Sequence, residues 1–261
     1  TSFVDVDTTK TSPAKTELPE RDSVMVDLSK TNLRGADLSG VNLVGVDLSG
    51  KDLTYANLSG QDLSGHDLTN TILRGADLSS SVLPDNGLSE KDFDHAILDE
   101  VDLSGKDLRH STFRYASLDN TNLENANLRV ADFYLVDLTK IKNKSLVNAN
   151  LIGAFFGHSN LSGVNLAGVA LDQNYFVHAN ISDVDFTDIS DKSIRGSLFT
   201  FANLSNTNFE GVDFEDATIY SKHYPGKAHL INEMELGFYN QLLLDSGFPN
   251  KVIVDKDVSG N

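Results

Sequence analysis

Residues 33–63 read LRGADLSGVNLVGVDLSGKDLTYANLSGQDL, and within this stretch a leucine returns at every fifth position. The series begins at Leu28 and continues without a slip to Leu138, with phenylalanine in place of leucine at Phe93, Phe113 and Phe133. A period of five fits neither the α-helix, with about 3.6 residues per turn, nor the alternation of a flat strand. The residue two places before each leucine is usually small, and the residue directly before it is usually Asp or Asn. The stretch therefore predicts a chain built from five-residue units.

One geometry accommodates this pattern. Each unit forms one short side of a coil, with its leucine and its small residue pointing inward, and four sides complete a turn of about 20 residues. Successive turns then pair backbone to backbone at the ~4.8 Å spacing of strands. We expect an all-β rod on the order of 45 Å long.

Segments such as Gly35-Ala36-Asp37-Leu38-Ser39 and Phe201-Ala202-Asn203-Leu204-Ser205 closely resemble the pentapeptide-repeat family. The resemblance covers about three quarters of the chain and implies that family's right-handed quadrilateral parallel β-helix, here with about nine to ten coils. It also implies a cap or a dimer module at the C-terminus, because a solenoid needs its open end covered.

The repeat divides the chain into parts. Its phase slips between Leu138 and Leu146 and again between Phe186 and Ile194, which predicts small bulges at coil corners at residues 139–143 and 187–191. We expect an extended N-terminal arm over residues 1–23, the β-helix over residues 24–221, and a helix with a tail over residues 222–261. The expected helix spans residues 228–246. Its apolar side, a cap or a homodimer surface, contains Leu230, Ile231, Met234, Phe238 and Leu242.

Composition narrows the function classes. The 21 Lys and Arg residues stand against 38 Asp and Glu residues, which gives a net charge of −17. Phosphate contacts require basic side chains, so we expect no direct binding to nucleic acid or to membranes, and a neutral or basic protein partner. No apolar stretch approaches the about 20 residues of a membrane helix. We expect a cytoplasmic protein or, alternatively, a secreted effector or a part of a virion.

Many acidic residues stand directly before an inward leucine. There an Asp side chain can accept hydrogen bonds from turn N–H groups, and Asn takes the same place in other units. This structural role accounts for much of the charge. A functional role remains open for Asp residues spaced by 20 or its multiples, which stack on one candidate electronegative face: Asp27, Asp47, Asp67 and Asp107.

Polar residues also occupy inward positions that are small elsewhere, namely Lys51, Gln61, His66, Lys91 and Lys106. Burial of an unpaired ammonium costs several kcal/mol, so we expect these side chains to extend outward past the corner or to distort the coil. Arg34, Arg74 and Arg114 recur at intervals of two coils, which predicts a solvated ladder that offsets acid repulsion.

Aromatic and histidine residues recur at the coil spacing near residue 160. Phe155 and Tyr175 are one coil apart, as are His158 and His178. We expect them to form either an exposed patch that contacts a partner or a surface feature without a role. Two stacked imidazoles could share a metal ion, but the sequence offers no third ligand. No catalytic motif occurs, so we expect no catalytic residue, no cofactor and no enzyme activity.

The resemblance implies two kinds of function. Some family members protect bacterial type II topoisomerases by DNA mimicry, in which an acidic, dimeric rod of about the width of B-DNA occupies the DNA-binding surface of the enzyme. The acidity and the expected dimer helix fit such a mimic, of bacterial or phage origin, that binds DNA gyrase. The alternative is an effector or scaffold module that binds a protein within a larger assembly, such as a host protein or a phage particle.

Overall fold

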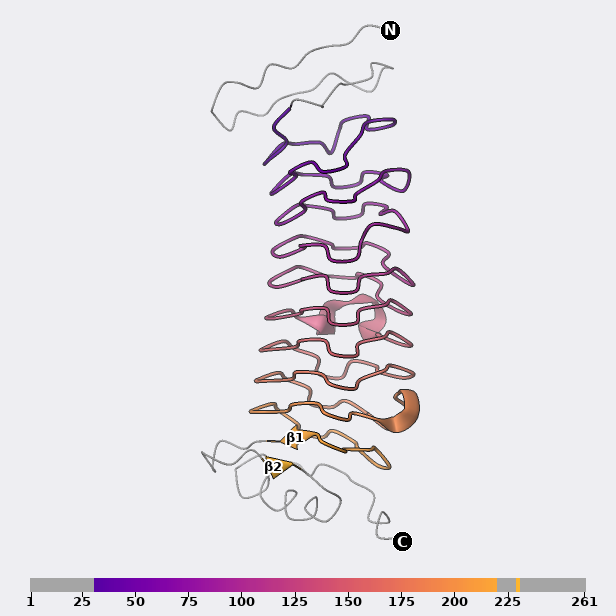
Figure 1. The fold of residues 1–261 in the computed structure, drawn as a ribbon, viewed down its shortest axis with the longest axis vertical. Coiled ribbons are helices and arrows are strands. Elements are labelled where there is room, and N and C mark those ends of the chain that lie inside the picture. Colours follow the sequence, from indigo (N-terminus) through magenta and orange to yellow (C-terminus); the bar gives the residue numbers. More distant parts are fainter. Residues whose placement is uncertain (1–30, 220–228, 231–261) are drawn as a thin grey trace, which may run out of the picture.

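The computed structural model describes residues 31–219 and the backbone of residues 229–230. Figure 1 shows the first of these ranges as a rod of stacked coils. Backbone hydrogen bonds join each coil to the next: the Leu53 N–H donates to the Ile72 carbonyl at 2.9 Å, and the Ile72 N–H donates to the Lys51 carbonyl at 2.9 Å. Parallel pairing of this kind repeats down the rod, as between Asp37 and Asn57. The predicted β-helical solenoid is confirmed.

We number the four sides of the coil by the buried residues at their centres. Side 1 contains Leu33, Leu53, Leu73, Phe93, Phe113, Phe133, Phe156, Phe176 and Phe199. Side 2 contains Leu38, Leu58, Leu78, Leu98, Leu118, Leu138, Leu161, Ile181 and Leu204. Side 3 contains Leu43, Leu63, Leu83, Leu103, Leu123, Leu146, Leu166, Phe186 and Phe209. Side 4 contains Leu48, Leu68, Leu88, Leu108, Leu128, Leu151, Leu171, Ile194 and Phe214.

Each side ends in a tight turn that its residue types favour. The Ala36 N–H donates to the Leu33 carbonyl at 3.1 Å, and Gly35 between them has a φ of 64°. A positive φ at this place is typical of a type II turn, and glycine adopts it without strain. Next, Asp37 Oδ1 accepts from the Ser39 N–H at 3.2 Å. Because turns recur so often, the sides contribute isolated parallel bridges instead of long strands.

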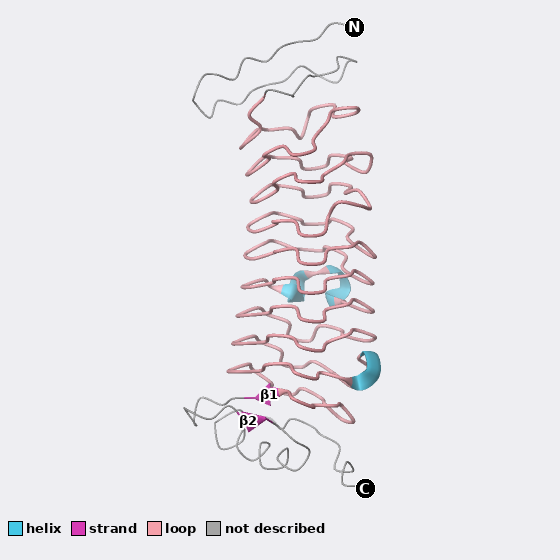
Figure 2. Ribbon diagram, viewed as in Figure 1, coloured by secondary structure: helices cyan, strands magenta, loops and turns pink. Residues whose placement is uncertain are grey.

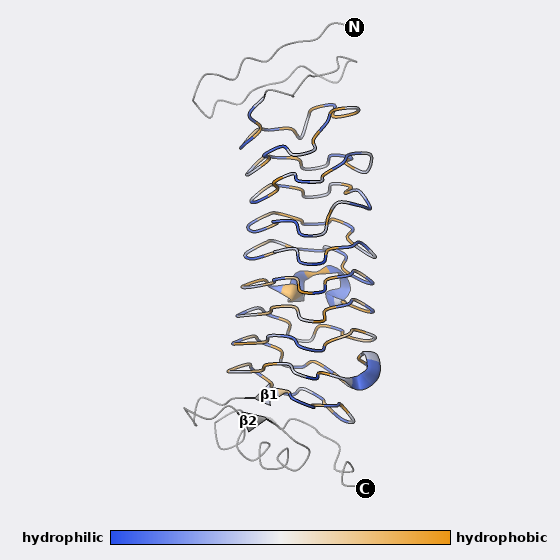
Figure 3. Ribbon diagram, viewed as in Figure 1, coloured by the Kyte–Doolittle hydropathy of each residue, from blue (hydrophilic) through white to orange (hydrophobic). Residues whose placement is uncertain are grey.

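The core is a narrow column of leucine and phenylalanine. Figure 3 shows apolar and polar residues alternating around the coils. Inside side 1, the rings from Phe93 to Phe199 form an unbroken stack in which neighbouring centroids lie 5.0 to 5.4 Å apart. Rings at this separation attract one another beyond the effect of burial alone. From Phe93 to Phe199, the core behind side 1 is therefore a continuous column of aromatic rings.

Two insertions interrupt the pairing at the predicted positions. Paired residues are 20 apart between Thr112 and Asp132, 23 apart between Asp132 and Phe155, and 20 apart again between Phe155 and Tyr175. The first insertion forms η1 (Leu138–Lys140) and η2 (Lys142–Lys144). The second forms η3 (Ser190–Lys192), and Figure 2 shows all three as helical turns. The added residues are confined to corners, so every side keeps its inward residue.

Gln61 and Lys91 point inward as hydrogen-bond donors. The expectation that these side chains extend outward past the corner is therefore wrong for both. The Gln61 amide donates to the Leu38 carbonyl at 2.7 Å. Lys91 is only 6% exposed, and its Nζ donates to the carbonyls of Leu68 and Thr71. A carbonyl oxygen has two lone pairs, so it can accept from a turn N–H and from an inward side chain together. Burial lowers the pKa of Lys91 below its ordinary value.

The other inward polar residues differ in how far they reach. His66 Nε2 lies 2.8 Å from the Leu43 carbonyl. Lys106 reaches the exposed Asp85, with 2.9 Å between Nζ and Oδ1, as expected for a side chain that extends outward. Lys51 is half-buried.

The C-terminal end of the rod differs from the prediction. β1 (Thr218–Ile219) pairs in antiparallel fashion with β2 (His229–Leu230). The expected helix over 228–246 is therefore wrong at its start, because Leu230 lies in a strand that pairs with the edge of side 1 on the last coil. Ile231, Met234, Phe238 and Leu242 lie outside the described residues, as do the arm over 1–23 and both domain boundaries. In the described part, no helix has the length and hydropathy of a membrane span.

Candidate functional site

Side 1 carries most of the apolar surface that the rod exposes. Seven of the ten exposed large hydrophobic side chains in the described residues lie there, namely Tyr55, Ile72, Tyr115, Leu135, Phe155, Tyr175 and Phe201. Single apolar residues on a surface need no explanation, but a patch that follows one face is typical of an interaction site.

A row of rings follows the turn at the end of side 1. His95 stacks on Tyr115 with centroids 4.7 Å apart, and Tyr115 meets Tyr134 edge to face at 5.8 Å. The row continues to His158 at 5.6 Å. His158 then stacks on His178 at 4.6 Å, and His178 stacks on Phe201 at 4.9 Å. We call these six rings the aromatic ridge.

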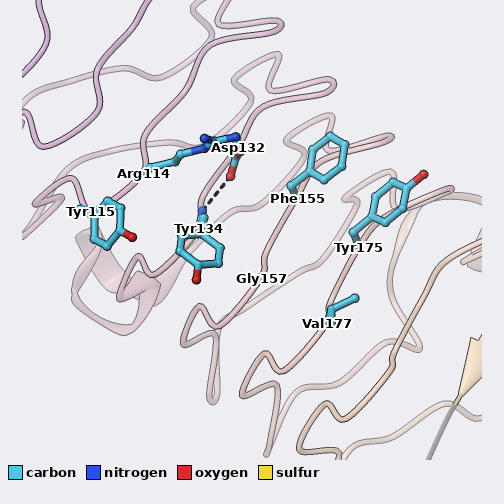
Figure 4. A pocket seen from close by; sticks show the side chains of 8 residues that line it. All are labelled: Arg114, Tyr115, Asp132, Tyr134, Phe155, Gly157, Tyr175 and Val177. Atoms are coloured by element: carbon cyan, nitrogen blue, oxygen red, sulfur yellow. Dashed lines mark hydrogen bonds and ion pairs between the residues drawn. The ribbon is translucent and has the colours of Figure 1, made fainter.

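A second, shorter row stands at the start of side 1. Phe155 and Tyr175 stack with centroids 4.6 Å apart and an angle of 9° between their planes. Between this row and the ridge lies a groove of about 420 Å³, which we call the side 1 groove. Figure 4 shows the side chains that line it: Arg114, Tyr115, Asp132, Tyr134, Phe155, Gly157, Tyr175 and Val177. Its volume lies in the range of ligand-binding clefts.

Gly157 opens the floor of the groove. The equivalent position on neighbouring coils carries Tyr134 and Val177. A Cβ atom at residue 157 would lie 3.0 Å from Cδ2 of Tyr134. The missing side chain therefore lets the Tyr134 ring lie close to the backbone of residue 157.

The charges on side 1 balance one another. Its acidic residues form ion pairs with arginines of the preceding coil: Arg34 reaches Asp52 at 2.7 Å, and Arg114 reaches Asp132 at 2.7 Å. Arg74 lies between two carboxylates, Asp92 at 3.3 Å and Asp94 at 3.2 Å. These pairs confirm the predicted arginine ladder. Farther along, residues 154–158, 174–178 and 197–201 contain no Lys, Arg, Asp or Glu.

The other three sides carry the excess of acid in the described residues. Side 2 has a single basic residue, Lys140, against seven acidic ones: Asp37, Asp77, Asp99, Glu100, Asp119, Asp137 and Asp183. Side 1, by contrast, has five basic residues, Arg34, Lys51, Arg74, Lys91 and Arg114. It has four acidic residues, Asp52, Asp92, Asp94 and Asp132. The groove thus lies on the one side that has no net negative charge.

The candidate electronegative face lies on side 4. Asp47 and Asp67 are on successive coils, but Gly87 separates them from Asp107, and Asp27 lies outside the described residues. Each of the three carboxylates accepts the N–H two residues on, at 2.9 Å from Ser49, 2.8 Å from Thr69 and 3.3 Å from Arg109. The side chains of Ser49, Thr69 and Arg109 also donate hydrogen bonds to these carboxylates. These side-chain bonds are the main cause of the lowered pKa of each carboxyl. These Asp residues stabilise turns.

The predicted aromatic and histidine patch is brought together on side 1. Phe155 and Tyr175 line the groove, whereas His158 and His178 belong to the ridge beside it. The sequence did not indicate Tyr115 and Tyr134, because Tyr134 stands 19 residues after Tyr115, one short of a coil, and the first insertion lengthens the coil that leads to His158. A spacing of 23 residues across that insertion places His158 in line with Tyr115, but it aligns Tyr134 with Gly157. In the part of the chain that the structure describes, no group of three metal-ligating side chains comes together.

Comparison with solved structures returns several repeat proteins. HetL, a pentapeptide repeat protein involved in heterocyst differentiation regulation from the cyanobacterium Nostoc sp. strain PCC 7120, is 28% identical, with 70% of this chain and 87% of that chain covered and a TM-score of 0.35. A trypsin-treated form of QnrB1, a plasmid-mediated fluoroquinolone resistance protein, is 19% identical, with 67% and 85% covered and a TM-score of 0.30. A pentapeptide repeat protein from the Arabidopsis thaliana thylakoid lumen is 20% identical, with 67% and 81% covered and a TM-score of 0.27.

No curated protein matches the chain significantly. The family model for pentapeptide repeats matches in eight copies, over residues 25–50, 52–83, 107–142, 145–188 and 194–220. These segments make up more than half of the sequence. The chain therefore belongs to the pentapeptide-repeat family.

Proposed function

We propose that this chain is a non-enzymatic, protein-binding solenoid that holds its partner on side 1. The observation that carries the proposal is the concentration of exposed apolar side chains on the one side without net negative charge. Aromatic side chains are enriched where proteins meet because they offer a large contact area at a low cost in conformational entropy. The stacked Phe core behind side 1 fixes the backbone that positions them.

A matched pair of variants tests this proposal. Val177→Arg places a long charged side chain on the groove floor, in a position that Arg74 and Arg114 already occupy on other coils. Val44→Arg makes the same change at the equivalent position of side 3, where Val44 is 78% exposed. Partners enriched from cell extract on the full chain would be identified, purified and titrated by calorimetry. We expect Val177→Arg to weaken binding at least about tenfold and Val44→Arg to leave it unchanged. Equal loss in both variants, or in neither, contradicts binding on side 1.

A second candidate function, DNA mimicry toward a type II topoisomerase such as DNA gyrase, is favoured by the acid on side 2. Side 2 carries seven acidic residues and one basic residue along the described rod. A gyrase supercoiling assay with purified protein tests this candidate. Inhibition of supercoiling, or relief of quinolone poisoning, supports it if side 2 variants with Asn in place of Asp lose the effect. Absence of both effects at micromolar protein rejects the mimic.

A further inference from the structure

We propose that the side 1 groove binds a short, extended segment of a partner protein that has the polyproline II conformation, an apolar, proline-containing core and basic flanks. This inference rests on the proposed function and specifies its ligand. It follows from four properties of the groove: its saturated backbone, its dimensions, its aromatic lining and the charge around it.

The backbone of the groove has no open edge to which a strand could add. The Phe133 N–H donates to the Phe155 carbonyl at 2.7 Å, and the Phe156 N–H donates to the Tyr175 carbonyl at 2.8 Å. The N–H groups of Phe155 and Tyr175 donate in turn to the preceding coil, each at 2.9 to 3.0 Å. Recognition by added β-structure needs unpaired backbone groups, so the groove must recognise its ligand through side chains.

The dimensions of the groove favour an extended chain over a helix. Its lining residues come from four successive coils, which at ~4.8 Å per coil makes it about 14 Å long. The two rows are three residues apart along the chain, and the turn at the end of the side shortens this distance to less than the about 10 Å that three extended residues span. An α-helix is about 10–12 Å wide with its side chains, so it would not fit between the rows. A polyproline II segment rises about 3.1 Å per residue, so about five residues fill the groove.

The lining matches the way such segments are recognised. Proline-rich segments dock in aromatic-lined grooves because they are already extended and lose little entropy on binding. Phe155 and Tyr175 stand in one row, and Tyr115 and Tyr134 stand in the other row on the two preceding coils (Figure 4). The phenolic hydroxyls of the tyrosines can donate to the carbonyls that a polyproline II backbone leaves unpaired.

Charge sets the flanks of the ligand. The groove itself is neutral, because Arg114 and Asp132 at one end are paired at 2.7 Å. The neighbouring sides are acidic and the whole chain carries a net charge of −17. Lys or Arg beyond the ends of the apolar core would thus be attracted, and association would slow as salt rises. A second copy of this chain would be repelled, and the area between the rows, at most about 140 Å², is far below the ~800 Å² that each partner of a stable dimer buries.

Selection from a phage-displayed library of random twelve-residue peptides on the full chain tests the inference. We expect enriched peptides to contain a core of proline and aliphatic residues with Lys or Arg on at least one flank. One enriched peptide, labelled with fluorescein, would be titrated by fluorescence anisotropy. Enrichment of amphipathic helical or acidic peptides, or no enrichment at all, overturns the inference.

Two matched pairs of variants locate the binding. Tyr175→Ala removes an aromatic ring of the groove, and Ile97→Ala removes an apolar side chain of side 2 with nearly the same exposed fraction, 38% against 39%. Val177→Arg and Val44→Arg form the second pair. We expect the groove variants to weaken the peptide at least about tenfold and the controls less than about twofold, with circular dichroism unchanged in all four. Equal effects within a pair overturn the inference.

The outcomes separate this inference from the proposed function. If a partner protein binds through side 1 but competes with no selected peptide, the peptide inference fails and the proposed function stands. If Val177→Arg alters neither partner nor peptide binding, both fail. Sedimentation that reveals a dimer which Tyr175→Ala dissociates would make a second copy the occupant and would overturn the inference.

Discussion

The phenylalanine stack inside side 1 predicts an interaction energy that can be measured between two buried residues. Phe156 is fully buried, with its ring centroid 5.4 Å from Phe133 and 5.1 Å from Phe176. Replacing it by leucine is tolerated by the geometry, because Leu53 and Leu73 fill the same position on other coils. The change removes two stacked pairs. At about 0.5–1.5 kcal/mol for each pair, Phe156→Leu should lower the free energy of unfolding by about 1–3 kcal/mol beyond the loss from burial.

A double-mutant cycle isolates one of these pairs. Phe156→Leu and Phe176→Leu each remove two pairs, but the double variant removes three in total because the residues share one. The double variant should therefore be more stable than additivity predicts by the energy of one pair, about 0.5–1.5 kcal/mol. Urea unfolding followed by circular dichroism measures the four free energies.

The control cycle combines Phe113→Leu with Phe176→Leu. These rings share no pair, because Phe133 and Phe156 stand between them. They are three coils, or about 14 Å, apart, so their effects should add within about 0.5 kcal/mol. Additivity in both cycles would refute the idea that ring stacking stabilises the core of side 1.

Two further predictions concern buried and turn-forming charges. Because hydrogen bonds at the turns lower the pKa of Asp47, Asp62 and Asp67 in the folded chain, their stabilisation is present above the unfolded value of about 3.9 and is lost as pH falls through the folded values. Replacing all three by Asn keeps the Oδ1 acceptor, so the urea midpoint should fall less than that of wild type between pH 6 and about pH 3; an equal fall contradicts the assignment. At pH 7, Lys91→Met should have a larger free energy of unfolding than wild type. This gap should narrow toward about pH 10, because burial lowers the pKa of Lys91, so that its ammonium loses its proton at a lower pH in the folded chain than in the unfolded chain. Lys144→Met, on an exposed residue, should show no such gap, and a destabilised Lys91→Met would show that the inward ammonium holds its coil together.

The sequence predicted the coil but not the surface that it builds. The five-residue period assigns the inward residues because only a four-sided coil keeps them all on one side of the backbone. The one-coil interval likewise places Phe155 beside Tyr175 and His158 beside His178. Tyr134 follows Tyr115 by 19 residues, one short of a coil, and the insertions lengthen the intervals that lead to His158 and to Phe201, so counting by twenties did not reveal the ridge.

Other features depend on backbone geometry that residue spacing does not encode. The carbonyls of Leu68 and Thr71 face the inside of the coil, which is why an inward Lys91 finds acceptors there. Gly157 matters to the groove because the ring of Tyr134, on the coil before it, lies where a side chain at residue 157 would stand. Strand β2 lies in a segment whose apolar pattern also suits a helix, and the open edge of the last coil decides its conformation.

The turn conformation of the ridge makes its rings separable from the scaffold. His95, Tyr115 and Phe201 have φ values of 58 to 60°, a region where glycine is unstrained. Exchanging such rings for glycine would erase the surface pattern while leaving every inward residue in place. A blank rod of this kind would give engineers an inert spacer of the same length, onto which other patterns of side chains could be written one coil at a time.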